Sequence, residues 1–205
     1  MHEIRWQTLR PMTSSTDTQP TLTTERLILR PFSPDDAPAV QRLAGDRAVA
    51  DTTERIPHPY ENGMAETWIA THSQQFRDLK ECTFAIVLKD GQQVIGAVGL
   101  TLTMAHARGE LGYWIGREFW NRGYCTEAAR TVVEYGFSGL GLHRIQARHL
   151  SRNPASGRVM AKLGMQHEGR LRQHTRKSGI FNDVDVYGVL PQDTDATKYL
   201  LCTSQ

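Results

Sequence analysis

The chain has 205 residues, of which 39% are hydrophobic and 22% charged, and its formal net charge is +2. A chain of this length can bury a core of its own, and this composition excludes a wholly disordered protein. The sequence contains no run of 18 apolar residues and no apolar signal segment, so we expect a cytoplasmic protein without a membrane span.

The distribution of charged and metal-binding residue types narrows the function classes further. Between Arg117 and Ile180 the sequence has 12 Lys and Arg residues against 4 Asp and Glu residues, which favours an anionic ligand. The three cysteines, Cys82, Cys125 and Cys202, are far apart and form no C-x-x-C pair. The eight histidines include no H-E-x-x-H pattern, so neither a disulfide framework nor a metal site is expected.

The N-terminal part of the chain predicts a lead-in followed by a strand and a helix. Residues 13–24 are rich in Thr, Ser, Asp and Pro without periodicity. We therefore expect a flexible N-terminal extension over residues 1–23, one folded domain over 24–190 and a C-terminal tail over 191–205. Residues 25–32 predict a strand that stops at Pro31, and a helix follows it after Ser33.

The middle of the chain predicts a second helix and an antiparallel sheet. Apolar residues at roughly helical spacing indicate a helix over residues 62–79. Residues 83–89 and 94–102 flank the turn signal KDGQQ and predict a β-hairpin, and residues 109–116 predict a third strand.

The remainder alternates helices and strands. Apolar residues from Thr126 onward follow a helical stripe that ends near Gly139. Residues 143–150 predict a strand and residues 153–164 a helix, an order that indicates a parallel crossover. Alternation over residues 183–190 predicts a last strand, paired as a hairpin with the segment before it.

The stretch FWNRGYCTEAAR, residues 119–130, places Gly123 directly before the predicted helix. A helix start has four amide N–H groups without partners and the positive end of the helix dipole, so an anion there can accept several hydrogen bonds. No Asp, Glu, Ser or Asn lies between Arg122 and Cys125 to cap these amides, which favours a bound phosphate or pyrophosphate. The alternative is an ordinary turn at Gly123, with Thr126 as the N-cap of the helix.

Several motifs, arriving in one order, resemble the GNAT N-acetyltransferases and among them the RimJ/RimL-type (ribosomal-protein-alanine acetyltransferase-like) enzymes. They are ELGYWIG, WNRGYCTEA, HRI, NPASGRVMAKLGMQHEGRLR and G-x-x-x-D-V-x-x-Y, and the resemblance covers about residues 24–190. It implies a mixed α/β (α+β) fold with a central, mostly antiparallel twisted sheet. In that fold six to seven strands are flanked by about four helices, with a parallel splay between the fourth and fifth strands of the family.

The resemblance also implies where acetyl-CoA binds. In the family, a Q/R-x-x-G-x-G/A turn holds the pyrophosphate through backbone amides, and a neighbouring strand edge pairs with the pantetheine arm. Cys125 stands where the family usually has Gly or Ala, and a reactive thiol is an alternative interpretation of it. The implied acetyl-CoA-binding residues are Trp114, Ile115, Arg122, Gly123, Tyr124, Cys125, Thr126, Asn153 and Ser156.

Some of these positions have a simpler interpretation. Asn153 could serve only as a helix cap. Four basic residues are candidates for the phosphate charges of CoA, although for each a solvated surface charge is the plainer explanation: Arg148, Arg152, Arg158 and Lys162.

For catalysis the resemblance implies a base, an oxyanion contact and a proton donor. We expect Glu110 to act as general base, directly or through water, with an ordinary strand carboxylate as the alternative. Glu168 and His174 are other candidates, and Thr175 occupies the position of the RimJ/RimL-type carboxylate. Ser156 is expected to protonate the CoA thiolate, and a backbone amide of residues 114–116 to bind the oxyanion.

The implied function is transfer of an acetyl group from acetyl-CoA to a primary amine, by direct attack in a ternary complex. The acceptor would be the N-terminal α-amine of a protein or peptide, or a small-molecule amine. The alternative is a catalytically silent acyl-CoA-binding sensor or interaction module on the same fold. Neither a nucleic-acid partner nor a metal is expected, and a monomer and a homodimer both remain open.

Overall fold

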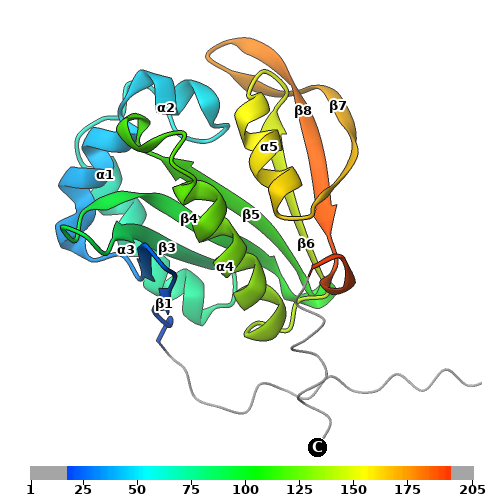
Figure 1. Ribbon diagram of the computed structural model, residues 1–205. Helices are drawn as coiled ribbons and strands as arrows, with labels where there is room; N and C mark the ends of the chain where they lie inside the picture. The colour runs from blue at the N-terminus through cyan, green and yellow to red at the C-terminus, as the bar shows by residue number, and fades with distance from the viewer. Residues whose placement is uncertain (1–17, 195–205) are drawn as a thin grey trace, which may run out of the picture.

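The computed structural model describes residues 18–194, which form one eight-stranded sheet with helices on both faces (Figure 1). The strand order is β1-β2-β3-β4-β5-β6-β8-β7, and every neighbouring pair is antiparallel except β5 and β6. The strands are β1 (Leu22–Thr23), β2 (Leu27–Arg30), β3 (Glu81–Leu88), β4 (Val94–Thr103), β5 (Arg108–Ile115), β6 (Arg144–Leu150), β7 (Gln166–Lys177) and β8 (Ile180–Val189).

Five α-helices cover the two faces of this sheet. Helices α4 and α5 lie in front of it in Figure 1, and α3 lies behind it. Short 3₁₀ turns flank several of the helices, including one over Arg117–Phe119 just before α4. The helices are α1 (Ala37–Ala44), α2 (Arg47–Thr52), α3 (Met64–Arg77), α4 (Tyr124–Ser138) and α5 (Pro154–Lys162).

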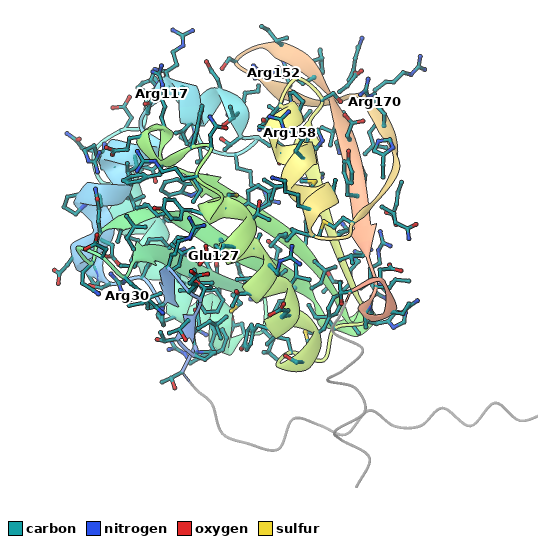
Figure 2. The ribbon with its side chains drawn as sticks, viewed as in Figure 1. Arg30, Arg117, Glu127, Arg152, Arg158 and Arg170 are labelled. Carbon is teal, nitrogen blue, oxygen red and sulfur yellow. The ribbon has the colours of Figure 1, made fainter. Side chains whose placement is uncertain are left out.

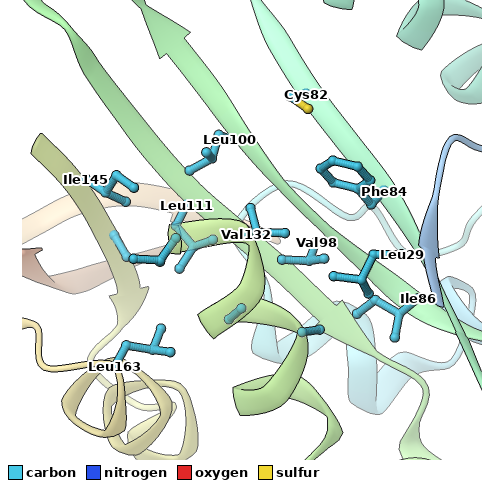
Figure 3. Packing of buried hydrophobic residues seen from close by; sticks show 14 of the residues in the cluster. Leu29, Cys82, Phe84, Ile86, Val98, Leu100, Leu111, Val132, Ile145 and Leu163 are labelled. Atoms are coloured by element: carbon cyan, nitrogen blue, oxygen red, sulfur yellow. The ribbon is translucent and has the colours of Figure 1, made fainter. Parts of the chain in front are cut away.

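The main core lies between the sheet and α4. Val132 of α4 packs in one cluster with Phe84, Leu100 and Ile145, which come from three different strands (Figure 3). A smaller cluster joins α1 to α3 on the other side of the sheet, through residues such as Val40 and Ile69. Because both faces are buried, the central strand β3 is apolar along almost its whole length rather than alternating.

The parallel pair β5–β6 is the place where the sheet opens. Its register runs only from Arg108 opposite Arg144 to Leu111 opposite Ala147. Beyond these four pairs the two strands continue without pairing to each other, β5 to Ile115 and β6 to Leu150. This is the parallel splay expected from the sequence, and it creates a gap in the middle of the sheet.

The fold class expected from the sequence is confirmed, with differences in detail. The sheet has eight strands rather than six or seven, and five helices rather than about four flank it. The additional strand β1 is only two residues long, and Leu22 and Thr23 pair there with β2, so ordered structure begins before the boundary expected at residue 24. Residues 1–17 of the expected extension, and 195–205 of the expected tail, lie outside the described residues.

The additional helix, α2, is a six-residue segment capped by Asp46, whose side chain accepts a hydrogen bond from the Ala48 amide at 2.8 Å. A segment of fewer than two helical turns shows no periodicity in sequence, so only its N-cap residue could have indicated it.

Candidate active site

A cavity of about 810 Å³ occupies the gap between β5 and β6. One of its ends is formed by the turn before α4 and by α5, and the other by the segment that follows α2 together with α3. Predicted site residues from separate stretches of sequence therefore line one cavity. Those that line it are Glu110, Trp114, Ile115, Gly123, Tyr124, Cys125, Thr126, Asn153 and Ser156.

The turn before α4 has the features of an anion-binding helix start. Gly123 is the N-cap residue with φ of 81°, and no side chain in the described part of the chain caps the helix. Asn121 also adopts a left-handed conformation, with φ of 61°, which Asn tolerates better than most residues. The Trp120 indole fixes the turn to the sheet by donating to the Ile115 carbonyl at 2.7 Å. The expected alternative, Thr126 as N-cap, is wrong because the helix begins at Tyr124.

Cys125 lies two residues after Gly123 and packs against the main core. Burial raises the pKa of its thiol to about 12. A thiol with this pKa is protonated at neutral pH, whereas a reactive cysteine needs a thiolate. The structure thus favours a packing role for the side chain over the alternative of a reactive thiol.

The part of β5 beyond its pairing with β6 forms one wall of the gap. A side-chain carbon at Gly112 would meet no atom within 4 Å, so the strand is open to the cavity there. One residue further, the Tyr113 hydroxyl lies 2.9 Å from Ser156 Oγ and 3.2 Å from the Ser156 carbonyl oxygen, across the gap on α5. Burial raises the pKa of Tyr113, which keeps this phenol protonated.

Asn153 begins α5 and also bridges the gap. Its Oδ1 accepts a hydrogen bond from the Ser156 amide at 3.4 Å, and its Nδ2 donates to the Thr52 carbonyl at 3.0 Å. The capping role considered from the sequence is therefore present. The same amide group holds the end of α2 against the start of α5.

Glu110 lies at the other end of the cavity, on the face of the sheet opposite α4. Its neighbour Leu111 belongs to the core under α4, and successive residues of a strand point to opposite faces. Glu110 is half-buried and accepts a hydrogen bond from Gln146 at 3.1 Å. Two guanidinium groups approach it, Arg148 at 3.4 Å and Arg55 at 3.7 Å.

The basic residues considered for the phosphates of CoA lie in different places relative to the cavity. Arg158 and Lys162 of α5 line the cavity, and Figure 2 shows Arg158 on that helix. Arg148 also lines the cavity, but its guanidinium pairs with Glu54 at 3.2 Å and with Glu110, at the end away from α4. Arg152 is not among the lining residues.

Of the residues expected to bind acetyl-CoA, Arg122 alone does not line the cavity. Its side chain is exposed, and its carbonyl oxygen accepts a hydrogen bond from Arg26 at 3.0 Å. The alternative bases also lie elsewhere, since Glu168 pairs with Arg144 and neither Glu168 nor His174 lines the cavity. Tyr187 packs between the rings of His149 and His167.

Sequence reasoning missed two contacts that shape this cavity. The ammonium group of Lys177, at the end of β7, donates to the carbonyl oxygens of Ala50, Thr53 and Ile56 and so ties the β7–β8 hairpin to the end of α2. Arg26 holds the turn before α4. Each contact joins residues about a hundred or more positions apart, and no local pattern marks either residue.

Within residues 18–194, no group of three or more His, Cys, Asp or Glu side chains is placed to hold a metal ion. In the same part of the chain no helix has the length and apolar character needed to cross a membrane.

Comparison with known proteins identifies the family. The family model of the acetyltransferase (GNAT) domain matches residues 26–166. The chain belongs to the GNAT acetyltransferase family. It is similar to the uncharacterized N-acetyltransferase YoaA of Bacillus subtilis, with 34% identity over 177 residues that cover 83% of this chain and 97% of that protein.

A ribosomal-protein acetyltransferase among the sequence relatives supports the RimJ/RimL-like subgroup expected from the motifs, and a solved structure shares the fold. The [ribosomal protein uS5]-alanine N-acetyltransferase of Escherichia coli is 25% identical over 171 residues, which cover 79% of this GNAT chain and 86% of that enzyme. A solved structure of RimL, a ribosomal L7/L12 α-N-protein acetyltransferase in complex with coenzyme A, superimposes with a TM-score of 0.76 at 15% identity. That alignment covers 84% of this chain and 97% of RimL, and it shows a shared fold.

Proposed function

We propose that this GNAT enzyme transfers the acetyl group of acetyl-CoA to a primary amine by direct attack in a ternary complex. The observation that carries the proposal is the cavity of about 810 Å³ through the gap between β5 and β6. It connects the uncapped start of α4 with the charged surroundings of Glu110, so two substrates can meet from opposite ends. Holding two reactants in line in this way removes much of the entropic barrier of a bimolecular reaction.

The end of the cavity at α4 suits the nucleotide part of acetyl-CoA. The pyrophosphate would accept hydrogen bonds from the first amides of α4, with Gly123 leaving room for its approach. Arg158 and Lys162 supply positive charge on the facing helix. The pantetheine arm would lie in the gap along the free part of β5, from Gly112 to Ile115, and pair with its backbone as an added strand does.

The opposite end suits the amine. Glu110 lies there as the proposed base, acting directly or through a water molecule. Its contacts with Gln146, Arg148 and Arg55 hold the carboxylate in place, and they also compensate part of its charge. An α-amine with a pKa of about 7.8 needs only about 1 kcal/mol to lose its proton at pH 7, whereas an alkylamine of pKa about 10.4 needs about 4.6 kcal/mol. An acceptor that loses its proton at so small a cost asks little of the base, which favours an N-terminal α-amine.

The proton for the departing thiolate would come from Ser156. Attack by the amine forms the new C–N bond, and collapse of the tetrahedral intermediate breaks the C–S bond and leaves CoA as a thiolate. Ser156 Oγ donates a proton to that sulfur and regains one from water, while the Tyr113 hydroxyl at 2.9 Å holds Ser156 Oγ in place. The Gly116 amide is already bonded to the Ile95 carbonyl at 2.8 Å. Because the amides of alternate strand residues point to the same neighbouring strand, the Trp114 amide opposite Ala97 also faces β4, so Ile115 remains the amide proposed for the oxyanion.

The test combines binding and turnover. Calorimetry with acetyl-CoA measures occupancy of the cavity, and release of CoA thiol measures transfer to a panel of N-terminal peptides, polyamines, aminoglycosides and amino acids. We expect binding, and turnover with at least one amine class, fastest for α-amines. Tight binding without turnover on any amine would support the silent sensor instead, and absence of binding would refute both functions.

A further inference from the structure

Arg26 lies between β1 and β2 and reaches over the turn that begins α4. Its Nη1 donates to the Arg122 carbonyl at 3.0 Å, and its guanidinium lies 4.6 Å above the centre of the Tyr124 ring. A side-chain carbon built on Gly123 would meet Arg26 Nη2 at 3.4 Å. The guanidinium therefore touches the residues on both sides of Gly123 and borders the glycine itself.

The same guanidinium pairs with Glu127 in the first turn of α4. Arg26 Nε donates to Glu127 Oε2 at 2.8 Å, and Nη2 lies 2.6 Å from that oxygen. The other oxygen accepts bonds from the Arg26 amide at 3.0 Å and from Thr24 Oγ1 at 2.6 Å. Figure 2 shows Glu127 on the side of α4 that faces β1.

This arrangement places a carboxylate beside amides that are proposed to bind a polyanion. Burial would raise the pKa of Glu127, but the hydrogen bonds from Thr24 and Arg26 outweigh that effect and lower it, so the carboxylate is ionised at neutral pH. Within the first turn of a helix, a side-chain carboxylate and an external anion compete for the same positive end of the helix. An uncompensated Glu127 would thus repel the pyrophosphate.

We propose that Arg26 is a positioning residue for acetyl-CoA, which neutralises Glu127 and holds the Arg122 carbonyl so that the amides at the start of α4 remain available to the pyrophosphate. This inference rests on the proposed function, because it assumes that acetyl-CoA binds at this turn. Arg26 acts through Glu127 and Arg122 rather than by contact with the ligand.

The charge argument is tested with Arg26→Gln, Glu127→Gln and the double variant, using calorimetry with acetyl-CoA. Loss of the guanidinium in Arg26→Gln should weaken binding by about tenfold, because one uncompensated charge then faces the diphosphate. The double variant should return to within about threefold of the wild type, since neither charge remains. Glu127→Gln alone, which keeps Arg26, should bind at least as tightly as the wild type.

Two controls separate this effect from general damage. S-acetyl-pantetheine carries the same thioester but no phosphate, so its KM in the thiol-release assay should be the same in all variants. Arg144→Gln removes the guanidinium of another ion pair, with Glu168, that does not line the cavity. It should leave acetyl-CoA binding unchanged.

The inference is overturned if the double variant binds as weakly as Arg26→Gln, which would indicate direct contact or simple loss of structure. It is also overturned if Arg26→Gln binds like the wild type, or if the KM for S-acetyl-pantetheine rises in parallel. If Arg26→Gln does not fold, the affinity of Glu127→Gln for acetyl-CoA decides. Binding at least as tight as that of the wild type supports the inference, and weaker binding overturns it. Failure of the wild-type protein to bind acetyl-CoA would instead refute the proposed function.

Discussion

Replacement of Gly123 by Val is the sharpest test of how the turn before α4 works. Gly123 has φ of 81°, a left-handed conformation that costs a residue with a side chain about 1–2 kcal/mol. That cost is small against the roughly 5–15 kcal/mol typical of a folded domain, so the variant should fold, with Tm lowered by only a few degrees. Binding should suffer far more, because the added side chain stands beside the amides proposed for the pyrophosphate.

The size of the binding defect follows from the hydrogen bonds at risk. Each hydrogen bond to a charged group contributes about 1.5–3 kcal/mol, so loss of one or two weakens acetyl-CoA binding by at least about tenfold. Gly91→Val supplies a matched control. Gly91 has φ of 74°, a side-chain carbon added there would meet no atom within 4 Å, and the residue does not line the cavity.

Calorimetry with acetyl-CoA and thermal unfolding of both variants separate strain from lost binding. Gly91→Val should show a similar loss of Tm with wild-type affinity. If Gly123→Val binds normally, or if Gly91→Val weakens binding to the same degree, the phosphate assignment of this turn is wrong.

Further tests address the rest of the site and the core. Glu110→Gln should leave acetyl-CoA affinity unchanged and lower kcat by about tenfold or more, and unchanged kcat in the thiol-release assay would exclude it as the base. Ser156→Ala and Tyr113→Phe should each lower kcat, and a double variant as impaired as the two single effects added together would show that Tyr113 does not act through Ser156. Cys125, with its pKa of about 12, should resist iodoacetamide at pH 8 in peptide mapping by mass spectrometry, and its rapid alkylation would contradict the burial argument. His72, whose ring nitrogens both lack hydrogen-bond partners within residues 18–194, has its pKa lowered by burial to about 4. The contribution of the neutral ring to the free energy of unfolding is complete above about pH 6.5 and falls by at most about 3 kcal/mol toward pH 4. The urea midpoint of His72→Phe should therefore change less with pH over that range than the midpoint of the wild type. An unchanged pH dependence would assign the loss of stability to other groups.

The parts of the site that could be predicted from the sequence are those determined by residues close together in the chain. The helix after Gly123 carries a continuous apolar stripe because one face of it packs on the sheet, and the stripe is visible without a structure. Asn153 is likewise recognisable as a cap because Pro154 follows it at the first helical position. In both cases the physical cause lies within one or two helical turns.

The parts that escaped prediction depend on contacts between distant segments. Arg26 meets Glu127 only because it precedes β2, a strand of the sheet on which α4 packs. Nothing within ERLILR indicates such a partner. Tyr113 looks like one of three apolar residues at a strand end, and its hydroxyl gains meaning only when α5 brings Ser156 to it. The surroundings of Glu110 were hidden for the same reason, since Arg55 and Arg148 come from two other segments.

The short pairing of β5 with β6 has a consequence for the mechanics of the molecule. Beyond the four paired residues, several side-chain bridges span the gap, among them Tyr113 to Ser156, Asn153 to Thr52, and Lys177 to the end of α2. The paired residues thus fix the distance between β5 and β6 at one end of the gap, and the side-chain bridges set the width of the gap beyond them. Single substitutions in these bridges should therefore change the width of the gap and leave every strand of the sheet intact. Such substitutions are a simple route by which evolution could fit the same fold to acceptors of different width.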